Sequence, residues 1–276
     1  MPCEIKKIYL VYFSPSGSTE KIVKTLASGI KGLEIENIDL LTSRSRKKKY
    51  IFSENDLVIF GSMTAGKLFT LSDEIFSCLE GHGTPFIGLV TYGNSYYGIA
   101  LKELQDRAIK SGFKVAALGA FIARHAIDFS VGEGRPDAQD NEKIIDFGQR
   151  AYKKIMAGDL ELHEQPRTNF SASEQANKLI AYREEHPDEA YALPPSYKSK
   201  EISEACIKCG TCAKHCPVNA INIQQKFFDL DKCIGCWACI NRCPVHAIKS
   251  TSREMADIMN TFSKTFAPRL EPDMFL

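Results

Sequence analysis

Short apolar runs alternate with amphipathic helical patterns through residues 1–157. The first helical pattern, Ser18–Ile30, repeats apolar residues three and four positions apart, which places them on one face for packing against a sheet. Similar patterns follow at Leu71–Leu79, Tyr96–Lys110 and Asp137–Met156. Five apolar runs have the length and composition of strands: Lys7–Phe13, Leu33–Leu40, Asp56–Phe60, Pro85–Thr91 and Phe113–Ile122. This alternation predicts βαβ units, and therefore an α/β fold with a doubly wound, five-stranded parallel sheet.

Residues 158–200 have a different character, because several prolines interrupt any long helix or strand. One helix is predicted there, over Ser171–Glu185. Ser171 at its start and Glu174 three residues later form the pattern of a capping box. We therefore interpret 158–200 as a partly helical linker.

A small cysteine-rich module follows the linker and occupies residues 201–250. The last part of the chain, 251–276, contains one more predicted helix at Ser252–Phe262 and ends in apolar residues. An apolar chain end is more stable against the protein than in water, so we expect this end to pack back as a docked tail.

The composition is that of an ordinary soluble globular protein, with 44% apolar and 25% charged residues and a formal net charge of +1. A charge so close to neutral argues against a general nucleic-acid or membrane-surface binder. The basic run Arg44–Lys49 is the local exception. It is either a solvated loop between strands or a docking patch for an acidic partner protein such as a small ferredoxin.

No signal peptide or membrane span is visible at the start of the chain. The apolar run Ile8–Phe13 is too short for either and leads directly into a polar loop. We therefore expect a cytoplasmic protein. This expectation bears on the cysteines, because a reducing compartment favours metal ligation over disulfides.

The cysteine-rich module is an internal repeat of the spacing C-x2-C-x2-C-x3-C-P, and the second copy begins 27 residues after the first. Its cysteines are Cys206, Cys209, Cys212 and Cys216, then Cys233, Cys236, Cys239 and Cys243. This spacing is typical of ferredoxins with two [4Fe–4S] clusters. Zinc is the alternative, but a zinc site needs four ligands, commonly in two separated pairs, and not eight in this order.

The reach of the thiolates decides how the eight ligands are shared. Three cysteines of one C-x2-C-x2-C loop can wrap one cluster, while the fourth is turned away by the following proline and serves the other cluster. One cluster is therefore assigned Cys206, Cys209, Cys212 and Cys243, and the other Cys233, Cys236, Cys239 and Cys216. Gly210 and Gly235 let the backbone approach the sulfur atoms, and Trp237 is expected to shield a cluster from water.

The loop after the first strand, Ser14–Thr19, is rich in hydroxyl groups and leads into a helix, which suits a phosphate. It lacks the lysine of a nucleoside triphosphate site, and by itself it could be only a polar turn. Two further loops, Gly61–Lys67 and Thr91–Gly98, follow strands that end at the same sheet edge. Together the loops could hold a phosphate and a flat ring. The candidate residues are Ser14, Ser16, Gly17, Ser18, Thr19, Met63, Thr64, Ala65, Gly66, Thr91, Tyr92, Gly93, Asn94, Tyr97 and Gly98.

These loops resemble those of a flavodoxin, which implies FMN as the ligand. The hydroxyl-rich loop is similar to the flavodoxin loop for the FMN phosphate, and the resemblance implies that Tyr97 stacks on the isoalloxazine. The competing interpretation is that Tyr97 is a core residue at a helix start. Many flavodoxins cover the other flavin face with a tryptophan, but Thr64 or Ala65 occupies that place here. One flavin face is then expected to be open and FMN to bind less tightly.

The whole chain resembles the flavodoxin–ferredoxin fusion proteins. The resemblance runs from the phosphate loop through both cysteine motifs to the chain end, Glu271–Leu276. It implies a flavodoxin-like FMN domain followed by a small α+β bacterial ferredoxin-like domain with two [4Fe–4S] clusters. His125 is a weak catalytic candidate, as a proton donor near the flavin or at the domain contact; the alternative is a loop histidine bonded to backbone. Lys67 is either near the flavin or an ordinary surface lysine.

Clusters pass single electrons, whereas a flavin accepts one or two, so the pair predicts an electron-transfer iron–sulfur flavoprotein with redox partners, a ferredoxin or a larger oxidoreductase. Two other functions compete: a reductase of a small organic substrate, and a redox-sensing adaptor. A pocket over the flavin lined by Met63, Tyr96 and His125 would favour the reductase, and an exposed flavin edge without a pocket would favour the carrier. An adaptor would show little turnover. Oxygen-sensitive clusters favour an anaerobic cell.

Overall fold

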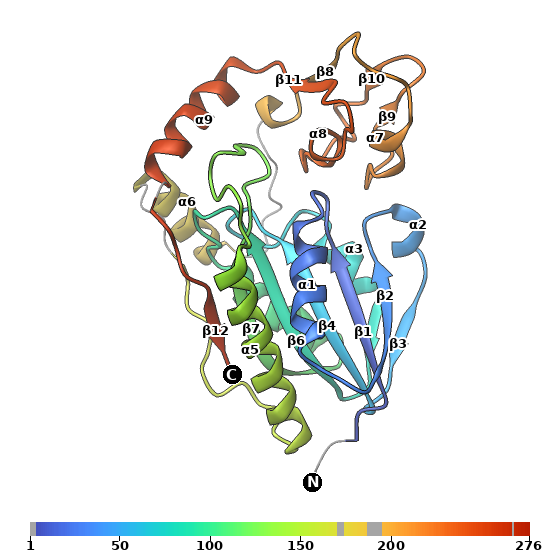
Figure 1. Cartoon of the computed structure of the whole chain (residues 1–276), viewed down its shortest axis with the longest axis vertical. Coiled ribbons are helices and arrows are strands. Elements are labelled where there is room, and N and C mark those ends of the chain that lie inside the picture. Colours follow the sequence, from blue (N-terminus) through green and yellow to red (C-terminus); the bar gives the residue numbers. More distant parts are fainter. Residues whose placement is uncertain (1–3, 170–173, 187–194, 267) are drawn as a thin grey trace.

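The computed structural model describes residues 4–169, 174–186, 195–266 and 268–276. A six-stranded sheet forms the centre of the larger, N-terminal part, and a small module lies over one end of it (Figure 1). The strand order is β12-β7-β6-β4-β1-β2. The strands are β1 (Lys7–Phe13), β2 (Glu34–Asp39), β4 (Asp56–Met63), β6 (Thr84–Tyr92), β7 (Phe113–Ile122) and β12 (Asp273–Phe275).

The five predicted strands are all present and pair in parallel. In chain order they lie 2-1-3-4-5, the flavodoxin-like doubly wound arrangement, with its switch point between β1 and β4. The buried runs of β4 and β6 read as continuous apolar segments because both of their faces are covered. The sixth strand, β12, was not predicted. It pairs antiparallel with β7 and comes from the chain end.

Helices cover both faces of the sheet. On one face lie α1 (Ser18–Ser28) and α5 (Ala138–Met156), which contribute Ile22, Leu26 and Phe147 to a core with the sheet. The opposite face is covered by α3 (Ser72–Ser77) and α4 (Ala100–Lys110). Three smaller elements complete this part: α2 (Ser43–Arg46), and β3 (Tyr50–Phe52) paired in parallel with β5 (Leu79–Gly81).

The predicted linker contains α6 (Glu174–Glu185) and a 3-10 turn, η1 (Pro195–Tyr197). Ser171, the predicted cap of this helix, lies outside the described residues. Lys102 of α4 forms an ion pair with Glu184, so α6 is held against the N-terminal part.

The cysteine-rich module is built from short elements related by the sequence repeat. It pairs β8 with β11 and β9 with β10, and it carries one short helix after each C-x2-C motif. Its elements are β8 (Lys200–Ile202), α7 (Thr211–Lys214), β9 (Ile221–Asn222), β10 (Phe227–Phe228), α8 (Ala238–Asn241) and β11 (Ile248–Ser250). The module sits over the carboxyl ends of the parallel strands, the edge where ligands bind in open α/β sheets (Figure 1).

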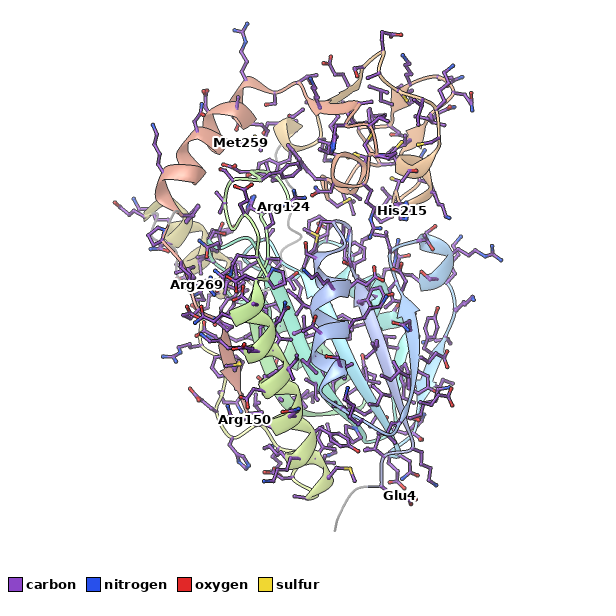
Figure 2. The ribbon with its side chains drawn as sticks, in the orientation of Figure 1. Glu4, Arg124, Arg150, His215, Met259 and Arg269 are labelled. Atoms are coloured by element: carbon purple, nitrogen blue, oxygen red, sulfur yellow. The ribbon has the colours of Figure 1, made fainter. Side chains whose placement is uncertain are left out.

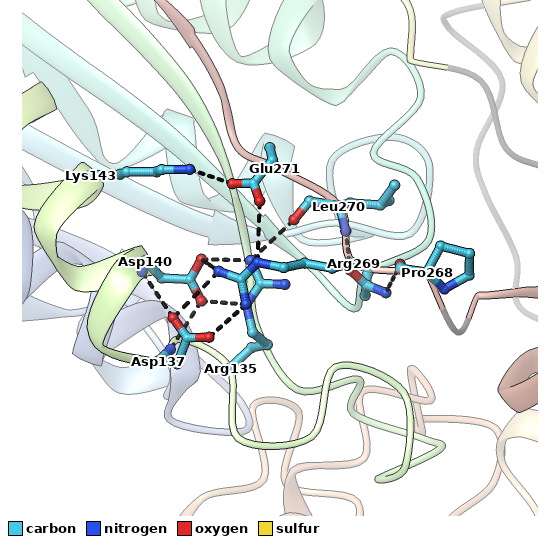
Figure 3. Close-up of polar contacts among 9 residues, drawn as sticks. Arg135, Asp137, Asp140, Lys143, Pro268, Arg269, Leu270 and Glu271 are labelled. Carbon is cyan, nitrogen blue, oxygen red and sulfur yellow. Dashed lines mark hydrogen bonds and ion pairs between the residues drawn. The ribbon is translucent and has the colours of Figure 1, made fainter.

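The chain end returns to the N-terminal part, as expected of a docked tail. After α9 (Arg253–Thr265), the strand β12 pairs with β7 and buries Phe275 to 1% exposure. Arg269 binds the carboxylates of Asp137 and Asp140 at the start of α5 (Figure 3). The Arg269 guanidinium holds the pKa of Asp137 well below its usual range. No helix among the described residues is both long and apolar enough to cross a bilayer.

Candidate functional site: a pocket between the sheet edge and the cysteine module

The predicted phosphate loop combines a sharp turn with a helix start. Gly17 precedes α1 at φ 92°, in the left-handed region that favours glycine. The side chains of Ser16 and Ser18 face the pocket described below. Across the described chain, no hydrogen-bond acceptor contacts the backbone N–H groups of Ser16, Ser18 and Thr19. The loop therefore presents unpaired donors at the N-terminus of an 11-residue helix, an arrangement that suits an anion.

Two other hydroxyl groups of this loop have structural roles. Ser14 is 1% exposed, and its Oγ accepts the backbone N–H of Glu20 at 3.0 Å. Thr19 is equally buried, and its hydroxyl shares a 2.7 Å hydrogen bond with the hydroxyl of Thr91. Ser14 and Thr19 therefore shape the loop through buried hydrogen bonds.

One pocket collects side chains from three loops of the sheet edge, as predicted, and adds a fourth loop and the cysteine module. The sheet-edge loops contribute Ser16, Ser18, Met63, Thr64, Ala65, Gly66, Phe69, Thr91, Tyr92, Gly93, Ser95 and Tyr96. The loop after β7 contributes Ala123, Arg124, His125, Ala126 and Ile127. The remaining wall comes from Tyr197, Gly235, Cys236 and Trp237, far along the chain. Sequence reasoning missed this last wall, because nothing local places the module over the sheet edge.

The structure corrects the role of Tyr97. Its side chain is fully buried, its ring packs edge-on against Tyr92, and its hydroxyl donates a 2.8 Å hydrogen bond to Asp273 Oδ2 in β12. Burial raises the pKa of Tyr97. The prediction that Tyr97 stacks on a flavin is therefore wrong, and the core interpretation holds. Tyr96 lines the pocket instead.

Asn94 and Gly98 also lie outside the pocket lining. The amide of Asn94 donates to the carbonyls of Phe266 and Pro268, and its Oδ1 accepts the N–H of Leu270, so this side chain anchors the tail. Gly98 passes so close to Gly66 that a Cβ would lie 2.0 Å from its carbonyl oxygen. Both predicted ligand contacts are therefore replaced by structural ones.

His125 lines the pocket, and its side chain is also hydrogen-bonded to the backbone of its own loop. Its Nδ1 accepts the N–H groups of Ile127 and Asp128 at 3.2 and 3.1 Å. Burial lowers the pKa of His125 to about 4. The ring is thus neutral near pH 7 with its proton on Nε2. It can donate a hydrogen bond there, but an imidazolium is not available as a proton donor.

Lys67 does not line the pocket, nor is it a surface lysine. It is 8% exposed, and its Nζ pairs with Glu103 at 3.4 Å. Desolvation raises the pKa of Glu103.

The residues of the basic run Arg44–Lys49 differ in burial. Arg46 is 4% exposed and donates to Pro217 O of the module at 2.7 Å, whereas Arg44, Lys47 and Lys48 are exposed.

Polar contacts hold the module over the pocket. Arg242, after α8, donates to the carbonyls of Ser14 and Pro15 in the phosphate loop, each at 2.7 Å. Asn241 donates to Ala126 O at 2.9 Å and accepts from Arg124 at 3.3 Å. Figure 2 shows Arg124 in the loop that reaches toward the module. The module is therefore bonded to two of the loops that line the pocket.

The eight cysteines belong to two ligand groups predicted from their spacing. Cys206, Cys209, Cys212 and Cys243 form what we call the first quartet, and Cys216, Cys233, Cys236 and Cys239 the second quartet. Burial raises the pKa of Cys212, and the nearby thiols of Cys206 and Cys243 raise it further. In the second quartet burial raises the pKa of Cys236 to about 12, with Cys216 and Cys233 adding to it.

The backbone around the cysteines repeats as the sequence does. The N–H groups of Ala220 and Ala247 donate to the sulfurs of Cys216 and Cys243, each at 3.2 Å. Hydrogen bonds of this kind stabilise a ligating thiolate. In the described residues no three or more His, Cys, Asp or Glu side chains gather around one ion position. A cluster, unlike a single ion, spreads its ligands around a cage of iron and sulfide.

Trp237 occupies a left-handed position, φ 58°, where the equivalent residue of the first repeat is Gly210 at φ 76°. A bulky residue at positive φ is an outlier that costs about 1–2 kcal/mol. Its indole N–H donates to Tyr197 O at 3.1 Å, and both residues face the pocket. The strained backbone therefore places an aromatic wall beside Cys236.

Comparison with known proteins agrees with the division into two parts. Residues 205–247 match the family model described as a 4Fe-4S dicluster domain. No curated protein matches the sequence. Two flavodoxins are among the similar solved structures. One, from the domain Archaea, is 18% identical, with a TM-score of 0.37 over 54% of this chain and 98% of its own. The other, flavodoxin 2 from Bacillus cereus, is 17% identical, with a TM-score of 0.39 over 54% of this chain and 99% of its own.

The assignment of the N-terminal fold rests on its strand order and helix layers. The chain therefore joins an α/β domain with the flavodoxin-like strand order to a 4Fe-4S dicluster domain. Residues 205–247 are the iron–sulfur part of the chain.

Proposed function

We propose that the chain holds two [4Fe–4S] clusters and one FMN, and that it carries single electrons between partner proteins and the flavin. The observation that carries the proposal is the composition of one pocket. Cys236, a ligand of the second quartet, lines it together with the phosphate loop and the other sheet-edge loops. The second cluster and the flavin would then be neighbours, with no further protein layer between them.

The residues of the pocket fit FMN. Ser16, Ser18 and the unpaired N–H groups at the start of α1 would hold its phosphate without a lysine. The apolar and aromatic side chains of Met63 and Tyr96 would line the flat ring system. When bound, FMN supplies a centre that exchanges one or two electrons.

The cysteine quartets fit two clusters. In the second quartet the thiols of Cys216, Cys233 and Cys239 lie close enough to interact electrostatically, as do Cys206, Cys212 and Cys243 of the first. Two sulfurs accept backbone N–H groups at equivalent positions of the repeat, and most of the thiols are buried. Trp237, which is 4% exposed, would shield the second cluster from water. The domains we propose are 1–157 for FMN and 201–250 for the clusters. The linker 158–200 and the tail in 251–276 attach one to the other.

A second candidate function is supported by one observation. Met63, Tyr96 and His125 all line the pocket, which is the condition expected of a reductase for a small organic substrate. In that function His125 would donate its Nε2–H to the substrate or the flavin as a neutral group. The module closes the same pocket from the other side, so a substrate would have to share it with the flavin. We therefore place electron transfer between proteins first.

The test is to purify the protein without oxygen and to quantify iron, sulfide and released flavin per chain. We expect about eight irons and a matching amount of sulfide for two cubane clusters, and one FMN. Zinc without sulfide would overturn the cluster part of the proposal. Failure to bind FMN after reconstitution would overturn the flavin part, and a clear excess of FAD over FMN would replace the cofactor.

Trp237 provides a variant that separates the two cofactors. Trp237→Gly keeps the left-handed backbone and all eight cysteines, so iron and sulfide should stay unchanged in protein kept free of oxygen, while flavin affinity falls about tenfold, equal to about 1.4 kcal/mol. Trp237→Phe is the matched control, because it keeps an aromatic wall and removes only the N–H donated to Tyr197. Equal flavin affinity in the native protein and Trp237→Gly would show that the indole does not contact the flavin.

A further inference from the structure

The two cysteine quartets differ in what they face. Cys236 of the second quartet is 9% exposed and lines the pocket. Its equivalent in the first quartet, Cys209, is the only cysteine classed as exposed in the described part of the chain. Two copies of one motif therefore point in different directions, one toward the flavin pocket and the other toward solvent.

The residues beside the two cysteines differ in the same way. Ile234 packs against the larger core and Gly235 lines the pocket. Their equivalents are Ile207, which is 63% exposed, and Lys208, which is also exposed. A large apolar side chain next to an exposed cluster ligand is a feature that a protein partner covers.

The charge around Cys209 is positive. Lys208 precedes it, and Lys214 is exposed on the short helix that follows. Glu204, the nearby acid, already forms a 2.8 Å ion pair with Lys226. Two lysines thus flank an exposed isoleucine and an exposed ligand, a surface that complements an acidic partner.

We propose that an acidic one-electron carrier protein docks on this surface, the docking face, made of Ile207, Lys208, Cys209 and Lys214. The exposed ligand Cys209 would give the carrier access to the first cluster, and Cys236 would place the second cluster beside the flavin pocket. The proposal rests on the proposed function. In each step the carrier loses one electron and the first cluster gains it, or the reverse, with no bond made or broken.

The exposed lysines that follow α2 are the competing surface. Lys47 and Lys48 have the same charge as the lysines of the docking face, but their neighbour Arg46 is buried against Pro217. Among the described residues, that segment also contains no cysteine. They therefore provide a matched control. A charge reversal there changes the net charge of the protein by the same amount as one on the docking face.

The experiment compares Lys208→Glu/Lys214→Glu with Lys47→Glu/Lys48→Glu. The probe is a purified acidic two-cluster ferredoxin, reduced and freed of reductant, and the readouts are its dissociation constant and its rate of cluster reduction. For the docking-face variant at low ionic strength, we expect the dissociation constant to rise about tenfold and the rate of cluster reduction to fall about tenfold. High salt should bring both values closer to those of the native protein. The α2 variant should change either value less than twofold.

With a small cationic donor, the methyl viologen radical, the charge reversal should have the opposite effect on the rate of cluster reduction. It should reduce the docking-face variant as fast as the native protein or faster, because Lys→Glu attracts a cation. Iron and sulfide content verifies that each variant is folded. Lys208→Gln/Lys214→Gln removes the two positive charges without adding negative ones, so it should give an intermediate loss of ferredoxin binding. Unchanged ferredoxin binding in these variants, or a larger loss in the α2 variant, would overturn the proposal. Clusters that viologen reduces while FMN stays oxidised would instead overturn the proposed function.

Discussion

The guanidinium group of Arg242 donates a 2.7 Å hydrogen bond to the carbonyl oxygen of Ser14. Ser14 belongs to the predicted phosphate loop, and Arg242 follows the last helix of the cysteine module, 228 residues later. A second bond of the same length reaches Pro15 O. A charged, forked donor thus ties the module to the loop that would hold FMN.

Replacing Arg242 by alanine should therefore loosen the contact between module and loop. Hydrogen bonds from a charged group contribute about 1.5–3 kcal/mol, so we expect flavin affinity to fall about tenfold or more while iron content is unchanged. Arg242→Lys should recover only part of the loss, since lysine lacks the fork. Arg150→Ala, which removes an exposed ion pair with Asp146, is the control. Flavin titration measures the difference, and equal affinities for the Arg242 and Arg150 variants would refute the coupling.

Gly17 should be required for its backbone conformation alone. It has φ 92°, and no atom lies within 4 Å of a Cβ built there. Gly17→Ala should cost about 1–2 kcal/mol of folding stability and weaken FMN binding, with the cluster absorbance retained. Gly32 has φ 83° and the same open surroundings, so Gly32→Ala carries the same backbone cost away from the pocket. Denaturant unfolding and flavin titration test the pair; loss of FMN binding in both would mean that stability, and not the loop, is responsible.

Tyr96 and Tyr97 should have separable roles. Tyr97→Phe removes the hydrogen bond to Asp273, so it should destabilise the tail by about 1 kcal/mol and leave the flavin spectrum unchanged. Tyr96→Ala should alter the flavin spectrum and affinity with a smaller effect on the tail, because Tyr96 lines the pocket. Limited proteolysis of the tail and flavin absorbance distinguish the two. A changed flavin spectrum in Tyr97→Phe alone would restore the stacking role.

His125 should make stability depend on pH. Its pKa is lowered by burial to about 4, against an ordinary value of 6.5 for histidine. The unfolded chain therefore binds a proton that the folded chain does not, and stability is lost as the pH falls from about 6.5 toward 4. Between pH 7 and pH 5.5 this loss amounts to about 1 kcal/mol.

His125→Asn is the control for this dependence, because its Oδ1 can still accept backbone N–H groups but does not titrate. Urea unfolding of the native protein and the variant, at both pH values and without oxygen, measures the difference in slope. The same pH dependence in both proteins would assign the loss of stability to other groups.

Much of this protein follows from local patterns. The periodicity of apolar residues predicted all five parallel strands, because a strand buried on both faces must be apolar along its length. The spacing of the cysteines predicted a two-cluster domain, which the dicluster match over 205–247 supports, since the reach of a few residues decides which thiols can share a cluster. The hydroxyl-rich loop before α1 predicted the unpaired N–H groups found there for a similar reason, as a helix start leaves its own N–H groups without partners.

Other features were decided by contacts between residues far apart in sequence. Tyr97 has the sequence context of a flavin-stacking residue, yet β12, arriving from the chain end, takes its hydroxyl and buries its ring. Arg46 lies in a run of basic residues that reads as a solvated loop, yet the module buries it against Pro217. Neither outcome is encoded in neighbouring residues, because burial depends on which surface packs there.

The position of the cysteine groups relative to the pocket was also decided by contacts between residues far apart in sequence. The sequence by itself determined that this chain carries a flavodoxin-like sheet and eight cysteines in two interleaved groups. Only the tertiary structure decided that Cys236 faces the pocket and Cys209 faces solvent. The two motifs have the same spacing, so spacing alone does not say which of them faces the pocket. Docking of the module through Arg242 and Asn241 breaks that symmetry and places one cysteine group beside the sheet edge.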